Sequence, residues 1–373
     1  MIILKEAKTK KELKEFVKFP FELYKNNPNW VPPIISDELE SFDKNINPVF
    51  EIADAYFYLA YKQNKIVGRI AIIINWQEVN NQNKKKIRFG WFDVIDDISV
   101  TKIMIDKVIE IGLKNKLEYM EGPIGFSNLD KVGALTEGYD QMGTMITWYN
   151  FPYYVNHFEK LGFTTEKEYI ESKFPFSNVK PELFEKAQEL IKKRYNLKPI
   201  NFTSTKDIMP YVDKMFDLFN TSYANLASFV AISERQKEFF KHKYINFINP
   251  EYIKYVEDSN GNLVAFAIVM PSFSVALQKA KGKLFPFGFL HLLMAKKKSK
   301  EVAFYLIGVH PDYQNKGVTA IIFQEYFKTF SEKGIINCLR TPELIDNIAI
   351  QLLWKNFDPK ITCRRSTFRK NLV

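Results

Sequence analysis

The segment Tyr305–Phe323, YLIGVHPDYQNKGVTAIIF, decides how the chain is expected to fold. An apolar, β-branched run stops at His310, the polar turn QNKG follows, and apolar residues then recur at helical spacing. A helix N-terminus offers unpaired N–H groups and the positive end of a dipole, which together suit a phosphate. Gly317 has no Cβ, so the backbone there can approach an anion closely. The spacing alone leaves two interpretations open, an anion-binding turn and an ordinary strand-to-helix loop.

The composition is that of a globular protein large enough for two domains. The chain has 373 residues, of which 46% are hydrophobic and 15% aromatic, so long disordered stretches are not expected. Lysine and arginine outnumber aspartate and glutamate by 53 to 43, which gives a net charge of +10. Most of this excess is diffuse, and the lysine runs at 84–86 and 296–298 are interpreted as solvated loops. The charge is compatible with an anionic ligand, a nucleic acid or a membrane surface, and its diffuse distribution favours solvated lysines over a nucleic-acid patch.

The two cysteines, Cys338 and Cys363, stand in apolar settings without the spacing of a zinc site or a disulfide framework. No bound metal is therefore expected. The N-terminus has no apolar stretch long enough for a signal peptide, and no run reaches the roughly 18 apolar residues of a membrane span. We expect a cytoplasmic protein without a membrane span.

The same order of elements occurs twice along the chain. Strand, helix, hairpin, strand, helix, strand, helix and strand follow one another in each half, with DSNGN as the tight turn of the second hairpin. This repeat predicts an α/β (α+β) fold of two tandem domains, residues 1–172 and 173–373, each a mixed, mostly antiparallel central sheet flanked by helices. In the second domain, 271–300 is expected to carry an amphipathic helix, and short strands at 361–363 and 367–370 are expected to end the chain.

The segment after the central strand resembles the GNAT superfamily of acyl-CoA-dependent N-acyltransferases. Val309 and Pro311 match the strand end that precedes the family's Gln/Arg-x-x-Gly-x-Gly/Ala motif, and Gln314 and Gly317 match the motif itself. The resemblance implies that the turn holds the pyrophosphate of acetyl-CoA or another acyl-CoA, and that the strand end contacts the pantetheine arm. The cofactor-binding residues implied in this way are Gly308, Val309, Gln314, Asn315, Lys316, Gly317, Val318, Thr319 and Asn347.

Three positions depart from the family pattern. Thr319 replaces the small last residue of the motif, and its side chain either donates to a phosphate or obstructs it. Trp354 stands where many members have the tyrosine that protonates the leaving thiolate, and an indole cannot do so. Asn356 replaces a glycine in the later helix, in which Asn347 takes the family's asparagine position. The first half has a matching FEKLGF at 158–163 but no Gln/Arg-x-x-Gly turn, so the resemblance implies one cofactor site, in the second domain.

Three residues near the turn are candidates for acid or base chemistry. Glu301 opens the central strand, where some members of the family place a general base, and the alternative is a solvated glutamate at a strand end. Tyr305 is a candidate acid, although a strand tyrosine is commonly a core residue. His310 precedes the turn and could titrate near neutral pH, or it is an ordinary loop histidine.

The glycine-rich segment 122–144 of the first half is expected to be a functional loop, because stretches of this length without secondary structure are uncommon. It contains Asn128, Asp130, Glu137 and Tyr139 and is followed by the aromatic run TWYNFPYY. Polar groups among aromatics suit an acceptor pocket and also suit a packed domain interface. We predict Asn128, Glu137 and Tyr139 as substrate-binding residues.

Together these features predict an N-acyltransferase that moves an acetyl or longer acyl group from acyl-CoA to the amine of a small molecule or peptide, by direct attack in a ternary complex. One alternative is a catalytically degenerate protein that binds acyl-CoA or another macromolecule, which Trp354 favours. Another alternative is an aminoacyl-tRNA-dependent transferase. The basic charge favours this last interpretation, and the QNKG turn opposes it.

Overall fold

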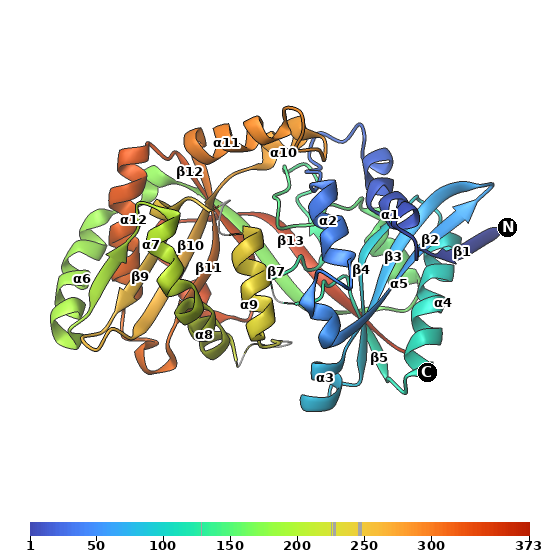
Figure 1. Cartoon of the computed structure of the whole chain (residues 1–373), viewed down its shortest axis with the longest axis horizontal. Coiled ribbons are helices and arrows are strands. Elements are labelled where there is room, and N and C mark those ends of the chain that lie inside the picture. The colour runs from blue at the N-terminus through green and yellow to red at the C-terminus, as the bar shows by residue number, and fades with distance from the viewer. Residues whose placement is uncertain (128, 225, 227–228, 245–247) are drawn as a thin grey trace.

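The chain was analysed as a computed structural model, which describes residues 1–127, 129–224, 226, 229–244 and 248–373. Strands from both halves join in one continuous sheet, and helices flank it along its length (Figure 1). Both termini lie in the first half of the molecule (Figure 1).

The elements of the described chain follow the order that the repeat predicts. The strands are β1 (Ile2–Glu6), β2 (Ala53–Lys62), β3 (Lys65–Asn75), β4 (Lys86–Val94), β5 (Tyr119–Gly122), β6 (Ala134–Glu137), β7 (Thr164–Pro175), β8 (Lys198–Asn201), β9 (Ile253–Glu257), β10 (Leu263–Pro271), β11 (Glu301–Val309), β12 (Asn337–Leu344) and β13 (Lys360–Asn371). The helices are α1 (Lys10–Leu23), α2 (Ile35–Phe42), α3 (Trp76–Asn81), α4 (Ile98–Lys114), α5 (Tyr153–Lys160), α6 (Pro181–Tyr195), α7 (Thr205–Ile208), α8 (Val212–Tyr223), α9 (Glu234–Tyr244), α10 (Ser274–Ala280), α11 (Gly288–Lys298), α12 (Thr319–Lys333) and α13 (Ile348–Trp354).

The sheet is mixed and mostly antiparallel. Its strand order is β1-β2-β3-β4-β5-β13-β7-β12-β11-β10-β9-β8, with β6 beside β13. In the described ladders, β4 with β5 and β11 with β12 are the parallel pairs. One parallel pair therefore lies in each half, at corresponding places in the repeat.

Helices cover both faces of the sheet in each half, because successive strand side chains point to opposite faces and both sets are apolar. In the first half, α4 and α5 pack over a core that includes Phe89, and α1 and α2 pack over the opposite face around Phe16. In the second half, α6, α12 and α13 pack around Phe304, and α8 and α9 cover the face that contains Phe266. The predicted fold class is confirmed.

The last strand of the chain, β13, lies within the sheet rather than at its edge. It pairs with β7 along most of its length and with β5 at its C-terminal end, where Phe368 is opposite Gly122. Phe368 is buried in the first-half core, with its ring 5.1 Å from that of Phe158. The two short strands expected near the C-terminus are therefore one strand with two register shifts. The predicted division at residue 172 falls inside β7, and the exact domain limits stay a prediction.

The insertion between β10 and β11 forms two helices, α10 and α11, where one amphipathic helix was expected. These helices extend along one side of the molecule towards the first half (Figure 1). Ser274 Oγ donates to the carbonyl oxygen of Gly143 at 2.9 Å, and Gln278 Nε2 donates to that of Pro28 at 2.7 Å. The pair of helices is thus attached to the first half. Within the described residues, no helix has the length and apolar character needed to cross a bilayer.

Candidate active site

A gap between β11 and β12 opens beside the sequence segment that predicted a ligand. The two strands pair in parallel as far as Phe304 and Arg340 and separate beyond that pair. On the other edge of β11, Ile268 of β10 is opposite Leu306, and Val269 of β10 is opposite Phe304. Tyr305 therefore has no counterpart on β10. Tyr305 is therefore the extra residue of a β-bulge, at the point where the gap begins. Bulges re-aim side chains and are common beside active sites.

The first half repeats this arrangement. The parallel pairing of β4 and β5 ends at Arg88 and Glu121. Just beyond it, the ladder between β3 and β4 shifts register, and Trp91 adopts a φ of 41°. A positive φ is unusual for a bulky residue and marks a local departure from strand geometry. Each half thus carries a bulge on its parallel strand, within a few residues of the last parallel pair.

The QNKG turn follows β11 and has a backbone conformation that depends on its sequence. Asn315 and Gly317 have φ values of 60° and 76°, in the left-handed region that favours asparagine and glycine. Gln314 Nε2 donates to the carbonyl oxygen of Val309 at 3.1 Å and ties the turn to the strand end. A Cβ on Gly317 would lie 2.7 Å from Cδ1 of Ile191 on α6. Both the backbone angle and this neighbour favour glycine at that position.

The N-terminus of α12 has open hydrogen-bond donors. Helix α12 begins at Thr319, and no side chain caps it. Among the hydrogen bonds of the described residues, none has the N–H of Gly317, Val318 or Thr319 as its donor. Lys316 is exposed, with Nζ 5.3 Å from the ring centre of Tyr195. Unpaired N–H groups with a lysine beside them can bind an anion.

The corresponding helix of the first half, α4, has a closed N-terminus. Asp97 caps it by accepting a hydrogen bond from the N–H of Ser99 at 3.0 Å, and it pairs with Lys62 at 2.8 Å. The hydrogen bonds from Lys62 and Ser99 lower the pKa of Asp97 to about 2, so this carboxyl is ionised at neutral pH. A phosphate at this helix end would meet a carboxylate. The contrast with α12 agrees with a single cofactor site in the second half.

The gap between strands in the first half is closed by the chain itself. After β5, the N–H of Ile124 donates to the carbonyl oxygen of Phe89 at 2.8 Å, so the next segment stays against β4. A Cβ on Gly90 would lie 2.4 Å from the carbonyl oxygen of Ile124. Arg88 Nη1 donates to the carbonyl oxygen of Gly125 at 2.9 Å. The described segment after β5 therefore lies against β4, whereas β11 and β12 separate at the corresponding place in the second half.

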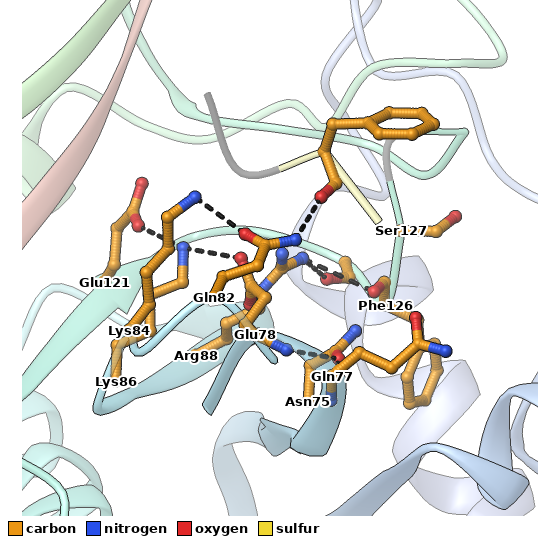
Figure 2. Close-up of polar contacts among 12 residues, drawn as sticks. Asn75, Gln77, Glu78, Gln82, Lys84, Lys86, Arg88, Glu121, Phe126 and Ser127 are labelled. Carbon is orange, nitrogen blue, oxygen red and sulfur yellow. Dashed lines mark hydrogen bonds and ion pairs between the residues drawn. The ribbon is translucent and has the colours of Figure 1, made fainter. Parts of the chain in front are cut away.

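A buried ionic cluster fixes the segment in this position (Figure 2). Lys86 pairs with Glu78 at 2.9 Å and with Glu121 at 2.8 Å, and Arg88 pairs with Glu78 at 2.7 Å. All four side chains are 1% exposed. Burial opposes ionisation, but Lys86 and Lys167 still lower the pKa of Glu121 to about 2. Because an unpaired charge in such a cluster would be very costly, its members hold each other in place.

A pocket of about 220 Å³ lies between the two halves. Its walls come from α8, α9, β9 and β10 of the second half and from α2 and the loop before β6 of the first half, with α10 and α11 beside them. Most lining side chains are apolar, among them Met215, Phe216 and Ile268. The bulge residues Trp91 and Tyr305 both line it, one from each half. The pocket therefore meets β11 at the residue where the gap to β12 begins.

One end of this pocket is polar. Asp130 Oδ2 accepts hydrogen bonds from the N–H of Ser127 at 2.8 Å and from its Oγ at 3.0 Å. Burial raises the pKa of the Asp130 carboxyl and lowers the pKa of the Lys131 ammonium. Tyr305 donates its hydroxyl to the carbonyl oxygen of Leu129 at 3.2 Å, and burial raises the pKa of that hydroxyl. Asp130 and Tyr305 thus meet where the two halves touch.

Helices α2 and α9 add further polar groups to the same pocket. Trp91 Nε1 donates to Glu38 Oε2 at 2.7 Å, and Lys243 Nζ donates to the carbonyl oxygen of Asp37 at 3.2 Å. Burial raises the pKa of Asp37 and raises that of Tyr244 well above its ordinary value. Among the described residues, no group of three His, Cys, Asp or Glu side chains could hold a metal ion. An apolar pocket that ends in carboxylates and lysines suits a long molecule with a polar head.

Of the three predicted catalytic residues, the structure brings Tyr305 to the pocket. Glu301 lies at the opposite end of β11, where its carboxylate pairs with Lys173 at 2.5 Å. His310 Nδ1 accepts a hydrogen bond from the N–H of Asp312 at 3.3 Å and caps the short helical turn that follows β11. Neither Glu301 nor His310 is among the described residues that line the pocket.

Several residues that the resemblance singled out have structural partners. A Cβ on Gly308 would lie 2.3 Å from the ring of Phe266, so only glycine fits there. Asn347 caps α13 through its side chain. Trp354 is buried, and its indole N–H donates to Glu343 Oε1 at 2.8 Å. Burial raises the pKa of the Glu343 carboxyl, which also accepts from Arg340. Both oxygens of Glu343 are therefore engaged.

Of the predicted acceptor residues, Glu137 and Tyr139 do not line the pocket. Asn128 is outside the described residues. Glu137 is exposed and pairs with Arg364 at 3.2 Å, while Tyr139 donates its hydroxyl to the carbonyl oxygen of Leu135 at 2.9 Å. The pocket is instead lined by the preceding part of the same loop, Leu129, Asp130 and Lys131.

Two curated proteins are similar to most of the chain, and no protein-family model matches it. Protein YghO of Escherichia coli strain K12 is 26% identical over 321 residues, which cover 84% of this chain and 80% of that protein. A bacterial ceramide synthase of Caulobacter vibrioides is 23% identical over 314 residues, which cover 83% of this chain and 80% of that protein.

A solved structure matches the chain from end to end. A tandem GNAT protein from the clavulanic acid biosynthesis pathway superposes with a TM-score of 0.59 at 9% identity, covering 100% of this chain and 99% of that one. At this identity the match bears on the fold alone, and it agrees with the two-domain organisation that the repeated order of elements predicts. The chain therefore has the fold of a tandem GNAT protein.

Proposed function

We propose that the chain is an N-acyltransferase that transfers an acyl group from acyl-CoA to the amine of a long-chain, apolar acceptor. The observation that carries the proposal is the position of Tyr305, which stands where β11 and β12 separate and also lines the apolar pocket. In the GNAT fold this gap receives the thioester arm. A donor in the gap and an acceptor in the pocket would therefore meet beside Tyr305.

The open N-terminus of α12 supports the assignment of the cofactor. The N–H groups of Gly317, Val318 and Thr319 have no described partner, and Lys316 adds positive charge. These groups would hold the pyrophosphate of coenzyme A. Asp97 occupies the corresponding position in the first half, so one coenzyme A per chain is expected.

Asp130 is the carboxylate that we assign as the general base. The amine nitrogen attacks the thioester carbonyl carbon, a C–N bond forms, the C–S bond breaks, and coenzyme A leaves as its thiolate. The nitrogen must lose a proton, and a partly buried carboxylate with a raised pKa is a better acceptor for it than an ordinary aspartate. One oxygen of Asp130 is held by Ser127, whereas both oxygens of Glu343 are engaged by Arg340 and Trp354.

The shape and lining of the pocket favour the class of acceptor. A short amine would leave apolar walls such as Met215, Phe216 and Ile268 in contact with water, whereas a hydrocarbon chain would cover them. The relative from Caulobacter is named as a ceramide synthase, and ceramides are amides of long-chain amino alcohols. We propose the same class, a long-chain amino alcohol, as the acceptor for this chain. Its ammonium and hydroxyl groups would face Asp130, Asp37 and Lys131.

The test measures release of free coenzyme A thiol. In the first series the acyl-CoA is fixed and the chain length of a primary amino alcohol increases. In the second series the amino alcohol is fixed and the acyl chain length increases. Turnover should increase with the length of the amine. Asp130→Asn should lower kcat by about 10²–10⁴. Asp140→Asn is the matched control, because Asp140 is an exposed aspartate of the same segment that does not line the pocket. Turnover that is indifferent to amine length would contradict the pocket assignment.

The position of Trp354 favours one alternative function. Its side chain is buried against Phe304 and Phe323, and an indole cannot protonate a leaving thiolate. A protein that binds acyl-CoA without turnover would have these features. Thermal stabilisation by acyl-CoA without thiol release from any amine of the series would support this alternative.

A further inference from the structure

The outer face of the α10–α11 pair is apolar and exposed. Phe285 and Phe287 in the connection between the helices are 75% and 67% exposed, and Met294 on α11 is 57% exposed. The exposed large apolar residues of this region are Val275, Phe285, Phe287, Phe289, Leu290, Leu293 and Met294. Single exposed apolar residues are ordinary, but a contiguous group of this size usually marks an interaction surface.

The inner face of the same helices is already used. Phe273, Leu277 and Leu292 are buried against Val31 and Ile34 of the first half. All five of these residues also line the pocket. Because the inner face packs on the protein, the exposed apolar residues are not the side of the helices that packs against the core. They form a second, separate face.

Positive charge surrounds this face. The segment 271–300 contains seven lysines and no aspartate or glutamate. Lysines precede the apolar connection at 279, 281 and 283, and they follow the apolar part of α11 at 296–298. Exposed phenylalanine, leucine and methionine flanked by lysines are typical of helices that lie in the interface of an anionic membrane.

We propose that the α10–α11 face binds the surface of an anionic lipid bilayer. The apolar side chains enter the headgroup region, and the lysines contact lipid phosphates. The hydrogen bonds from Ser274 and Gln278 to the first half hold this face at a fixed position on the molecule. This inference goes beyond the proposed acyl transfer, although the two fit together, since the helices that face the bilayer also form one wall of the pocket.

The test is cosedimentation of the full chain with vesicles of phosphatidylcholine alone and of phosphatidylcholine mixed with phosphatidylglycerol, without acyl-CoA or amine. Binding should be strong with the anionic vesicles and weak with the neutral ones. Leu293→Ser should weaken binding roughly tenfold, because the variant lacks the favourable transfer of the exposed half of a leucine side chain from water to the bilayer. Leu113→Ser on α4 is its matched control, since Leu113 and Leu293 are 46% and 49% exposed.

A second pair of variants tests the charge. Replacing Lys297 and Lys298 with glutamine should weaken binding to anionic vesicles roughly 30-fold. The same change at Lys10 and Lys11, two exposed lysines on α1, should leave binding unchanged. Melting curves of each variant check that it folds.

The outcomes separate this proposal from its rivals. Failure to sediment with anionic vesicles, or equal losses in the test and control variants, would overturn it. A concentration-dependent dimer that Leu293→Ser dissociates, without vesicle binding, would instead assign the face to a second copy of the chain. Because the vesicle assay contains no substrate, a lack of vesicle binding would not contradict the acyl-transfer proposal. A lack of turnover in the thiol-release assay would likewise not contradict the vesicle-binding proposal.

Discussion

A carboxylate placed at Thr319 should separate cofactor binding from fold stability. Thr319 is the first residue of α12, half-buried, at a helix end with no side-chain cap. A negative charge at this position favours the helix by about 0.3–1 kcal/mol. The same charge about 6 Å from a pyrophosphate carrying about two negative charges costs roughly 1.4 kcal/mol in water and roughly 5.5 kcal/mol at an effective dielectric of about 20. Thr319→Glu should therefore weaken acyl-CoA binding by between about tenfold and about 10⁴-fold, while the unliganded protein stays folded.

Thermal unfolding with and without acyl-CoA measures this effect. At a ligand concentration of about 100 times Kd, the parent gains about 2.7 kcal/mol, and a variant that binds tenfold more weakly gains about 1.4 kcal/mol. With roughly 2–4 °C for each kcal/mol, the ligand should raise the Tm of the parent by about 5–11 °C and that of Thr319→Glu by at most half as much.

Two controls limit the interpretation. Thr319→Gln has a side chain of the same size without the charge, and Thr205→Glu makes the same replacement at the first residue of α7. Both should keep most of the ligand-induced shift. If Thr319→Glu is stabilised as much as the parent, coenzyme A does not bind at the N-terminus of α12, and the reasoning from the open N–H groups is wrong.

Three further predictions follow from other parts of the structure. Gly317→Ala and Gly261→Ala both force alanine into a left-handed conformation and should each cost about 1–2 kcal/mol in unfolding experiments, but only Gly317→Ala should also reduce the acyl-CoA-induced Tm shift. For Asp130, turnover should be lost as pH falls through a pKa above the ordinary aspartate value. The same raised pKa means that the folded protein loses stability as pH rises from the unfolded-state pKa of Asp130 through its folded-state pKa. Asp130→Asn should therefore have a higher Tm than the parent at neutral pH, and the difference should shrink in acid. Phe368→Ala should cost about 3–5 kcal/mol, whereas Ile361→Ala, half-exposed on the same strand, should change stability by less than about 0.5 kcal/mol, as urea unfolding would measure.

The order of elements could be predicted because it depends on local signals. The turn DSNGN, the apolar runs and the helix after Gly317 are each specified within a few residues. The open N-terminus of α12 was predicted for the same reason, since the QNKG turn and the helix start are adjacent in sequence. Its contrast with Asp97, which caps α4, is also visible in the sequence once the two helices are matched.

The pocket could not be predicted, because its polar residues come from separate parts of the chain. Asp37 lies on α2, Lys131 on a first-half loop and Tyr244 on α9, and no spacing relates them. Tyr305 reaches the pocket through a bulge, which a regular strand pattern does not reveal. The sequence predicts Glu301 as a candidate base because it opens the strand, but the gap and the pocket both meet that strand further along.

The position of β13 also could not be predicted, and it affects how the chain must fold during synthesis. Strand β5 ends at Gly122, yet its neighbour β13 begins only at Lys360, near the end of the chain. At about 5–20 residues per second, a ribosome needs roughly 10–50 s to make the intervening residues. During that interval the first half has an unpaired strand edge and lacks Phe368 from its core. The first half can therefore complete its sheet only after residues up to Asn371 have been translated, and until then its open edge is a site for mispairing or chaperone binding.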